Sequence, residues 1–254
     1  MEAGEESVPR FVIRAGYACY LGPSTNSSFH GHAAFQIAIA LQGGVTMLDA
    51  SGTCHRGVAL IVPPMVRHRM LAATSLRVFF VDPHCAFADR LRERCGDDIN
   101  GITAAPDLSG LREEHVRPAG ARPSSQIDGR LLAAMDALAD SGPGRRSVPM
   151  PRLAEEVGLS PQRLRALARH QLGMPLARWR IWQRLIRAAE ALREGQSPAD
   201  AAITGGFADQ AHLNRQMRDM MGLTPSVLRP ILLRPIPRPS AATRDVHRDR
   251  TEDG

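Results

Sequence analysis

A duplicated pattern in the last third of the chain constrains the fold more than any other feature. In its first copy, an apolar-patterned segment follows Pro151 and ends at Gly158, and another begins at Ser160 and Pro161. Serine is a favoured N-cap, and proline suits the first helical position because its missing N–H would be unpaired there anyway. The pattern predicts two helices joined by a short glycine turn, a helix-turn-helix unit over residues 153–173.

The second copy repeats this plan further along the chain. Ser197 begins a helix through residue 203, a Gly-Gly pair forms the turn, and Asp209 begins a helix through residue 221. Residues 175–193, between the two copies, carry apolar side chains at helical spacing, which predicts one long connecting helix. We expect Trp179 and Trp182 of this helix to pack in the core rather than to stack on bases.

The second helix of each unit has two chemically different faces. One face is apolar, with residues such as Leu164 and Leu213. The opposite face carries amides, guanidinium groups and small side chains: Gln162, Arg165, Ala166 and Arg169 in the first unit, and Gln210, Ala211, Asn214, Arg215 and Arg218 in the second. Arg pairs with guanine, Asn and Gln pair with adenine, and Ala packs on a thymine methyl. A solvated helix face is the alternative, but two such faces lacking acids favour DNA binding.

The stretch from Leu153 to Arg229 closely resembles the DNA-binding domain of AraC/XylS-type bacterial transcription regulators. The resemblance is strongest in GGFADQAHLNRQMRDMMGLTPSVLR, over residues 205–229. It implies base contacts at Gln162, Arg165 and Ala166 in the first unit and at Gln210, Ala211 and Arg215 in the second. The chain departs from the family at Leu213 and Met217, where aromatic residues are usual. By this resemblance the partners are double-stranded DNA at promoters and, if the protein activates transcription, RNA polymerase.

The connecting helix sets the spacing of the two readers. Nineteen residues at the helical rise span roughly 28 Å. Successive major grooves on one face of DNA lie about 34 Å apart. One chain is therefore expected to read two adjacent grooves.

Charge and composition agree with a DNA-binding, cytoplasmic protein. The formal net charge is +6, no Lys is present, and residues 145–229 hold 14 Arg against 7 Asp and Glu. A local positive excess favours phosphate contact. The four Cys have no paired spacing that would indicate a disulfide framework or a zinc site. No signal peptide or membrane span is expected.

The first half of the chain is β-rich, so the fold class expected is α+β. Short runs between Arg10 and Val81 are separated by Gly, Pro, Ser and Asn, as in an antiparallel barrel or sandwich. Helices are expected at residues 90–95, 108–115 and 127–139. The domains expected are 1–140 for sensing and dimerisation, 141–149 as linker, 150–229 for DNA binding, and 230–254 as a disordered tail. The apolar face of helix 127–139 is interpreted as part of a homodimer contact, with packing on its own barrel as the alternative.

One group of residues in the β-rich half has the spacing of a ligand site. His30, His32 and Gln36 are followed by Gly43, and then Gly57, Pro63 and His68. These spacings resemble the two cupin motifs and the cupin-like sensory domain of many AraC-type regulators. That resemblance implies that His30, His32, Gln36 and His68 converge, either on a divalent metal such as Zn, Ni, Fe or Mn or around a small organic effector. A purely structural barrel remains a third alternative, because Gln36 replaces the usual metal-binding Glu.

Two other classes of function need discriminating observations. A metal-dependent cupin enzyme with a DNA-binding appendage would need an acid or base near the histidines, and Asp49 and Asp82 are the nearest candidates in sequence. A DNA-coating protein would need recognition faces without base-reading side chains. The sequence favours a regulator that is not an enzyme.

Overall fold

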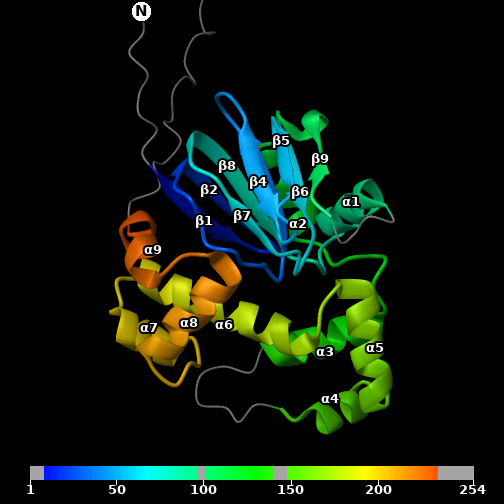
Figure 1. Cartoon of the computed structure of the whole chain (residues 1–254). Helices are drawn as coiled ribbons and strands as arrows, with labels where there is room; N and C mark the ends of the chain where they lie inside the picture. The colour runs from blue at the N-terminus through cyan, green and yellow to red at the C-terminus, as the bar shows by residue number, and fades with distance from the viewer. Residues whose placement is uncertain (1–8, 97–100, 140–147, 234–254) are drawn as a thin grey trace, which may run out of the picture.

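The computed structural model describes residues 9–96, 101–139 and 148–233. A two-sheet β domain lies against a helical domain, and the long helix α6 runs beneath the sheets (Figure 1). This arrangement confirms the expected α+β class. None of the helices in the described ranges is long and apolar enough to cross a membrane.

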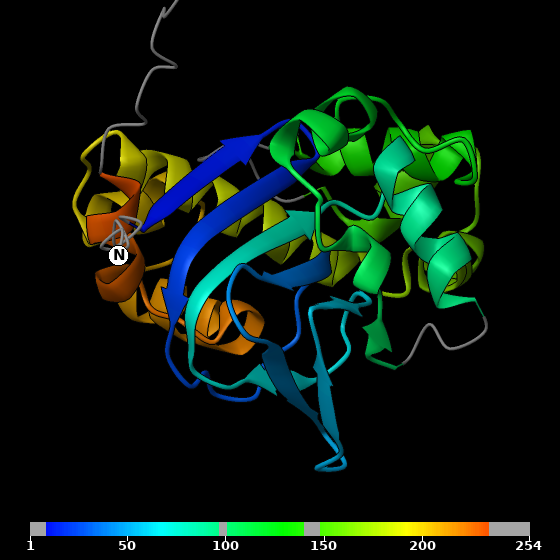
Figure 2. The same cartoon turned by 90° about the horizontal axis from the view of Figure 1, so that it is seen from above.

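The larger sheet has six antiparallel strands in the order β1-β2-β8-β3-β6-β9. The smaller has the order β5-β4-β7. In chain order the strands are β1 (Arg10–Arg14), β2 (Tyr17–Ser24), β3 (Phe35–Ala40), β4 (Val45–Asp49), β5 (Cys54–Gly57), β6 (Ala59–Val62), β7 (His68–Met70), β8 (Ala73–Val81) and β9 (Thr103–Ala104). The larger sheet curves over α6 when seen from above (Figure 2).

Strand β3 shows why both faces of the larger sheet are buried. Phe35, Ile37 and Ile39 belong to a core cluster with residues of the first two helices. Ala38 belongs instead to the cluster that continues into the helical domain. Since side chains alternate along a strand, Gln36 lies on the same side as Ala38. The face of β3 that carries Gln36 is therefore turned toward the helical domain.

The β domain is followed by α1 (Ala86–Cys95), the 3-10 turn η1 (Pro106–Leu108), α2 (Glu113–Gly120) and α3 (Gly129–Ala139). The helices expected at residues 90–95 and 127–139 are confirmed, but the one at 108–115 is wrong. Pro106 begins a separate short turn, and Arg112 is extended and precedes the true helix. The Arg112 backbone N–H donates to Nδ1 of His115 at 3.1 Å, which stabilises a start at residue 113.

The apolar face of α3 is covered by this chain's own helical domain. Leu131, Met135 and Leu138 are buried, and α3 packs against the three following helices α4 (Met150–Glu156), α5 (Pro161–Leu172) and α6 (Leu176–Arg193). The interpretation of this face as a dimer contact is therefore wrong, because the face is buried within the same chain. Sequence periodicity identifies the apolar face but not what covers it.

Both helix-turn-helix units form as predicted. The first comprises α4 and α5, and the second comprises α7 (Pro198–Thr204) and α8 (Gln210–Met221). Ser160, Ser197 and Asp209 are N-caps whose side chains accept from the backbone N–H three residues on. Both α5 and α8 end at a left-handed glycine, Gly173 and Gly222.

The last helix, α9 (Pro225–Leu232), continues past the boundary expected at Arg229. Leu228 and Leu232 are buried, and the helix packs against β1. This burial explains why the chain stays helical where the composition favoured a disordered tail. Residues 234–254, the rest of that expected tail, and most of the expected linker at 141–149 lie outside the described residues.

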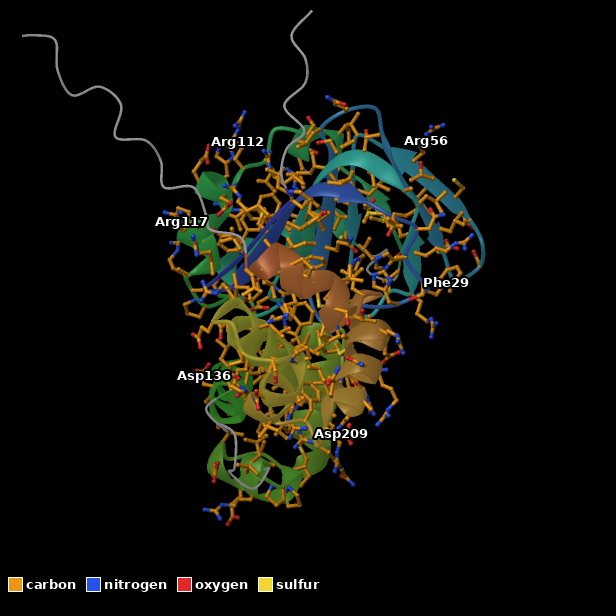
Figure 3. All side chains as sticks on the ribbon, turned by 90° about the vertical axis from the view of Figure 1, so that its left-hand side faces the viewer. Phe29, Arg56, Arg112, Arg117, Asp136 and Asp209 are labelled. Carbon is orange, nitrogen blue, oxygen red and sulfur yellow. The ribbon has the colours of Figure 1, made fainter. Side chains whose placement is uncertain are left out.

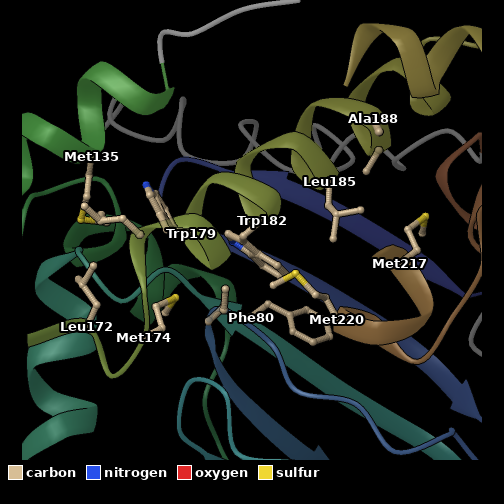
Figure 4. Close-up of a cluster of buried hydrophobic side chains, with 14 of the residues drawn as sticks. Phe80, Met135, Leu172, Met174, Trp179, Trp182, Leu185, Ala188, Met217 and Met220 are labelled. Atoms are coloured by element: carbon tan, nitrogen blue, oxygen red, sulfur yellow. The ribbon is translucent and has the colours of Figure 1, made fainter. Parts of the chain in front are cut away.

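Helix α6 joins the two domains. Trp179 and Trp182 are buried, as predicted, and Figure 4 shows Trp182 next to Phe80 and Trp179 nearer Met135. The indole N–H of Trp182 donates to Oδ1 of Asp82, just after β8, at 2.9 Å. The tryptophans therefore form an interdomain core rather than the core of the helical domain alone.

Candidate functional site

The outer face of α5 is open to solvent. Its inner residues, Leu164, Leu167, Ala168 and Leu172, are buried. The four residues predicted to read DNA are all exposed: Gln162, Arg165, Ala166 and Arg169. Arg163 and His170 are exposed beside them. The face can therefore approach a groove without any rearrangement of the helix.

The outer face of α8 is similar, with one exception. Gln210, Ala211, Arg215 and Arg218 are exposed, whereas Leu213, Met217 and Met220 are buried. Asn214 is only partly exposed, and its Oδ1 is buried without a hydrogen-bond partner among the described residues. Four of the five predicted residues thus lie on the open face, and Asn214 lies at its edge.

The three predicted histidines of the β domain converge. His30 and His68 face each other in an antiparallel bridge between their backbones. Nε2 of His30 lies 3.1 Å from Nε2 of His32, and the ligand atoms of all three rings lie within 4.8 Å of one another. All three side chains and Gln36 are buried. The structure therefore brings together every residue that the cupin resemblance implied.

Backbone carbonyls orient two of these imidazoles. Nδ1–H of His30 donates to the Ser28 carbonyl at 2.7 Å, and Nδ1–H of His68 donates to the Val66 carbonyl at 2.9 Å. In this tautomer the Nε2 lone pairs of both rings are free to accept. Nε2 of His68 and Oε1 of Gln36 are buried and have no partner among the described residues.

Burial keeps the cluster neutral. Desolvation lowers the pKa of His30, and it lowers the pKa of His32 well below its usual value. Desolvation and, to a smaller extent, the neighbouring His30 together lower the pKa of His68 to about 4. Neutral imidazoles are the form that binds metal ions.

The residues fit the divalent cation that a cupin barrel implies. Nitrogens bound to one tetrahedral zinc ion lie about 3.4 Å apart, given Zn–N bonds of about 2.0–2.1 Å. The separation of 3.1 Å between His30 and His32 is close to this value. Metal-binding histidines usually donate their other ring N–H to a backbone carbonyl, a carboxylate or water, as Nδ1–H of His30 and His68 does here. Nε2 of the three histidines would hold the cation, and Oε1 of Gln36 is the protein oxygen available beside them.

A cavity of about 200 Å³ opens next to the cluster, between the β domain and the end of the helical domain. Phe11, Val78 and Phe80 line it from the sheet, and Leu223, Val227, Leu228 and Ile231 line it from α9 and the segment before it. His30, His32 and Gln36 form its polar end. None of the described residues that line it is Arg, Asp or Glu. The helical residues of this wall were not predicted, because they are far from the histidines in sequence.

The two sequence candidates for an acid or base are engaged elsewhere. Asp49 is the register partner of His68 on β7, but its Oδ2 lies 3.0 Å from Nε2 of His55 on β5, at the opposite edge of the smaller sheet. Asp82 accepts from Trp182, and burial raises the pKa of its carboxyl group. Neither belongs to the group of residues that could hold a metal ion.

Comparisons with known proteins agree with the geometry. Residues 153–230 match the model of the helix-turn-helix domain family. The chain is similar to apo ToxT from Vibrio cholerae, with 11% identity and a TM-score of 0.58, over 86% of this chain and 98% of that one. It is also similar to the unsaturated fatty acid-bound form of wild-type ToxT, with 11% identity and a TM-score of 0.55, over 87% and 97% of the two chains. No curated protein matches the sequence.

These findings indicate the class of protein to which the helical domain points. The C-terminal segment belongs to the helix-turn-helix domain family, and the chain is a DNA-binding regulator of transcription. Its two units, joined by α6, have the arrangement that the resemblance to AraC/XylS-type regulators predicted. The similarity to ToxT extends over both domains and shows that they share its fold.

Proposed function

We propose that the chain binds specific promoter sequences by placing α5 and α8 in two adjacent major grooves. The observation that carries the proposal is that both helices bury their apolar faces and expose the side chains of Gln162, Arg165, Gln210 and Arg215. In this proposal Gln162, Arg165, Ala166, Gln210, Ala211 and Arg215 contact bases. Arg169, Asn214 and Arg218 support them from the ends and edges of the two faces.

The length of α6 supports simultaneous reading of two grooves. Its 18 residues span about 27 Å at the helical rise. That length is similar to the roughly 34 Å between successive major grooves. One chain then covers two half-sites, and a homodimer adds avidity rather than creating the site. The homodimer contact in this proposal excludes the buried face of α3.

The cavity beside the histidines supports regulation by a small apolar effector. One solved ToxT structure contains an unsaturated fatty acid, and another contains (E)-4-(8-methylnaphthalen-1-yl)but-3-enoic acid. The cavity here has the apolar walls for such a molecule. No Arg is among its described lining residues, so an acidic head group would be received by uncharged polar side chains: His30, His32 and Gln36 at one end, and Ser24, Thr25 and Ser27 elsewhere in the lining.

The remaining parts of the proposal follow from this role. The protein acts in the cytoplasm and contacts RNA polymerase where it activates transcription. Residues 1–140 sense and dimerise, and residues 150–229 bind DNA. In this proposal it is not an enzyme, because the carboxyl groups of Asp49 and Asp82 are already engaged with His55 and Trp182.

Selection of DNA from a random pool tests the proposal directly. The full-length chain is incubated with random duplexes and excess nonspecific competitor at raised salt. We expect enrichment of one bipartite motif, because base contacts persist where phosphate contacts are weakened. Binding without any enriched motif would indicate a DNA-coating protein, and turnover of a small molecule by the same preparation would favour the enzyme.

A further inference from the structure

The histidine cluster of the β domain lies directly against the last turn of α8. Figure 3 shows this helix running from Asp209, far from the sheets, toward the edge of the β domain that carries Phe29. The Gly31 backbone N–H donates to the Asp219 carbonyl at 3.4 Å. The Met220 carbonyl lies beside His32, where it raises the pKa of that ring. The histidine cluster therefore also forms part of the contact between the two domains.

Gly222, at the end of α8, makes the closest approach. A Cβ atom added at this glycine would lie 2.7 Å from Nδ1 of His30. The corresponding glycine at the end of α5, Gly173, has nothing within 4 Å of the same position. The two recognition helices thus end alike in backbone conformation, but only the second is packed against the cluster.

The cluster is incomplete without a further occupant. Nε2 of His68 and Oε1 of Gln36 are buried acceptors that have no donor in the described part of the chain. Burying such groups unpaired is unfavourable, and a cation at the centre of the cluster would satisfy both. One water molecule could donate a hydrogen to each of them, but it would have none left for a third acceptor. Only a cation uses the lone pairs of all three imidazoles at once.

We infer that His30, His32 and His68 bind a divalent cation that holds α8 against the β domain, so that the cation controls DNA reading by the second unit and not by the first. This inference rests on the proposed function for its DNA-binding part. The outer face of α8 stays exposed while its last turn is docked. Holding a reading helix in place reduces the ordering cost of binding, so the cation strengthens the contact of α8 with DNA.

Metal content is the first measurement. Full-length protein is treated with a chelator and titrated with Zn²⁺ or Ni²⁺ in competition with a chromophoric chelator. We expect about one equivalent per chain, weakened at least about a hundredfold by His68→Gln because one of three nitrogens is lost. His55→Gln is the matched control, since His55 pairs with Asp49 outside the cluster, and it should bind like the wild type. Wild-type protein that binds no cation overturns the inference.

A second pair of variants tests the link to α8 without touching a ligand. Gly222→Ala and Gly173→Ala carry the same left-handed strain, but only the first places a methyl group against His30. We expect Gly222→Ala to weaken cation binding at least about fivefold and Gly173→Ala to change it less than about twofold. Equal effects of the two variants contradict a cation site at the α8 contact.

The third measurement is a footprint on a duplex selected by the metal-loaded wild-type chain. The half-site of α8 is identified as the one whose protection Arg215→Ala removes. Adding Zn²⁺ to chelator-treated protein should lower the concentration needed to protect this half about tenfold, and should change the other half less than about twofold. Equal change at both halves, or weaker protection with Zn²⁺, overturns the inference. Failure to protect any selected duplex, with or without Zn²⁺, would instead count against the proposed function.

Discussion

The indole N–H of Trp182 donates to the buried carboxyl group of Asp82 at 2.9 Å, which makes it a hydrogen bond between the long helix α6 and the end of β8. Both side chains are buried, and the ring of Trp182 also lies 6.3 Å from the ring of His32. The helix that spaces the two readers is therefore tied to the strand beside the candidate ligand site.

Trp182→Phe should lower the free energy of unfolding by about 1–3 kcal/mol, because it leaves a buried acceptor without its donor. Trp179→Phe is the matched control, since Nε1 of Trp179 has no hydrogen-bond partner among the described residues. Urea denaturation of both variants gives the comparison. If Trp179→Phe costs as much as Trp182→Phe, ring packing and not this hydrogen bond holds the two domains together.

Leu131→Ala should destabilise the chain by about 2–5 kcal/mol, because it leaves a cavity where α3 packs on the helical domain. Leu132→Ala, on a half-buried neighbour, should cost distinctly less. The oligomeric state, measured by sedimentation, should be the same for both variants and the wild type. A shift toward monomer in Leu131→Ala alone would restore the dimer interpretation of this face.

The stability of metal-free protein should depend on pH through the histidine cluster. Burial holds the pKa of His68 at about 4, below the value of about 6.5 expected in the unfolded chain. Between these values the unfolded state binds more protons than the folded state. The free energy of unfolding is therefore highest above about pH 6.5. As the pH falls toward 4, His68 lowers it by about 3 kcal/mol.

Urea denaturation of chelator-treated protein at several pH values between these limits measures this loss. His68→Gln should flatten the slope and His55→Gln should not. A slope unchanged in His68→Gln would show that other groups cause the acid sensitivity.

Arg215→Ala and Arg218→Ala should differ in kind. Arg215 lies nearer the start of α8, where side chains meet base edges, so its loss should cost about 1–3 kcal/mol on the specific site and relax one base position. Arg218 lies one turn further on and is expected to meet phosphate. Its loss should weaken binding to all sequences alike and make the dependence on salt shallower. Gel-shift titrations on specific and unrelated duplexes separate the two outcomes, and equal losses for Arg215→Ala would refute its base-reading role.

The recognition helices could be predicted because local signals define them. Ser160, Asp209 and the glycines at the helix ends act on their immediate neighbours, and the structure confirms each of them. The convergence of His30, His32 and His68 was also predictable, because the resemblance of two segments to cupin motifs implies it.

The contacts between domains could not be predicted in the same way. Gly222 beside His30 and Trp182 beside Asp82 join residues far apart in sequence, and no local pattern identifies such partners. For the same reason the apolar face of α3 was recognised but assigned to the wrong partner. The helix expected at residues 108–115 was misplaced because the cap formed by His115 outweighed the apolar periodicity.

In the proposed complex one chain reads two grooves, with α5 in one and α8 in the other. A scan of single base substitutions across the selected site, measured with wild type, Arg165→Ala and Arg215→Ala, tests this arrangement. We expect each variant to relax base preference at a different position, and the two positions to lie about 10–10.5 base pairs apart. Relaxation at the same position, or a uniform loss at every position for both variants, would contradict it.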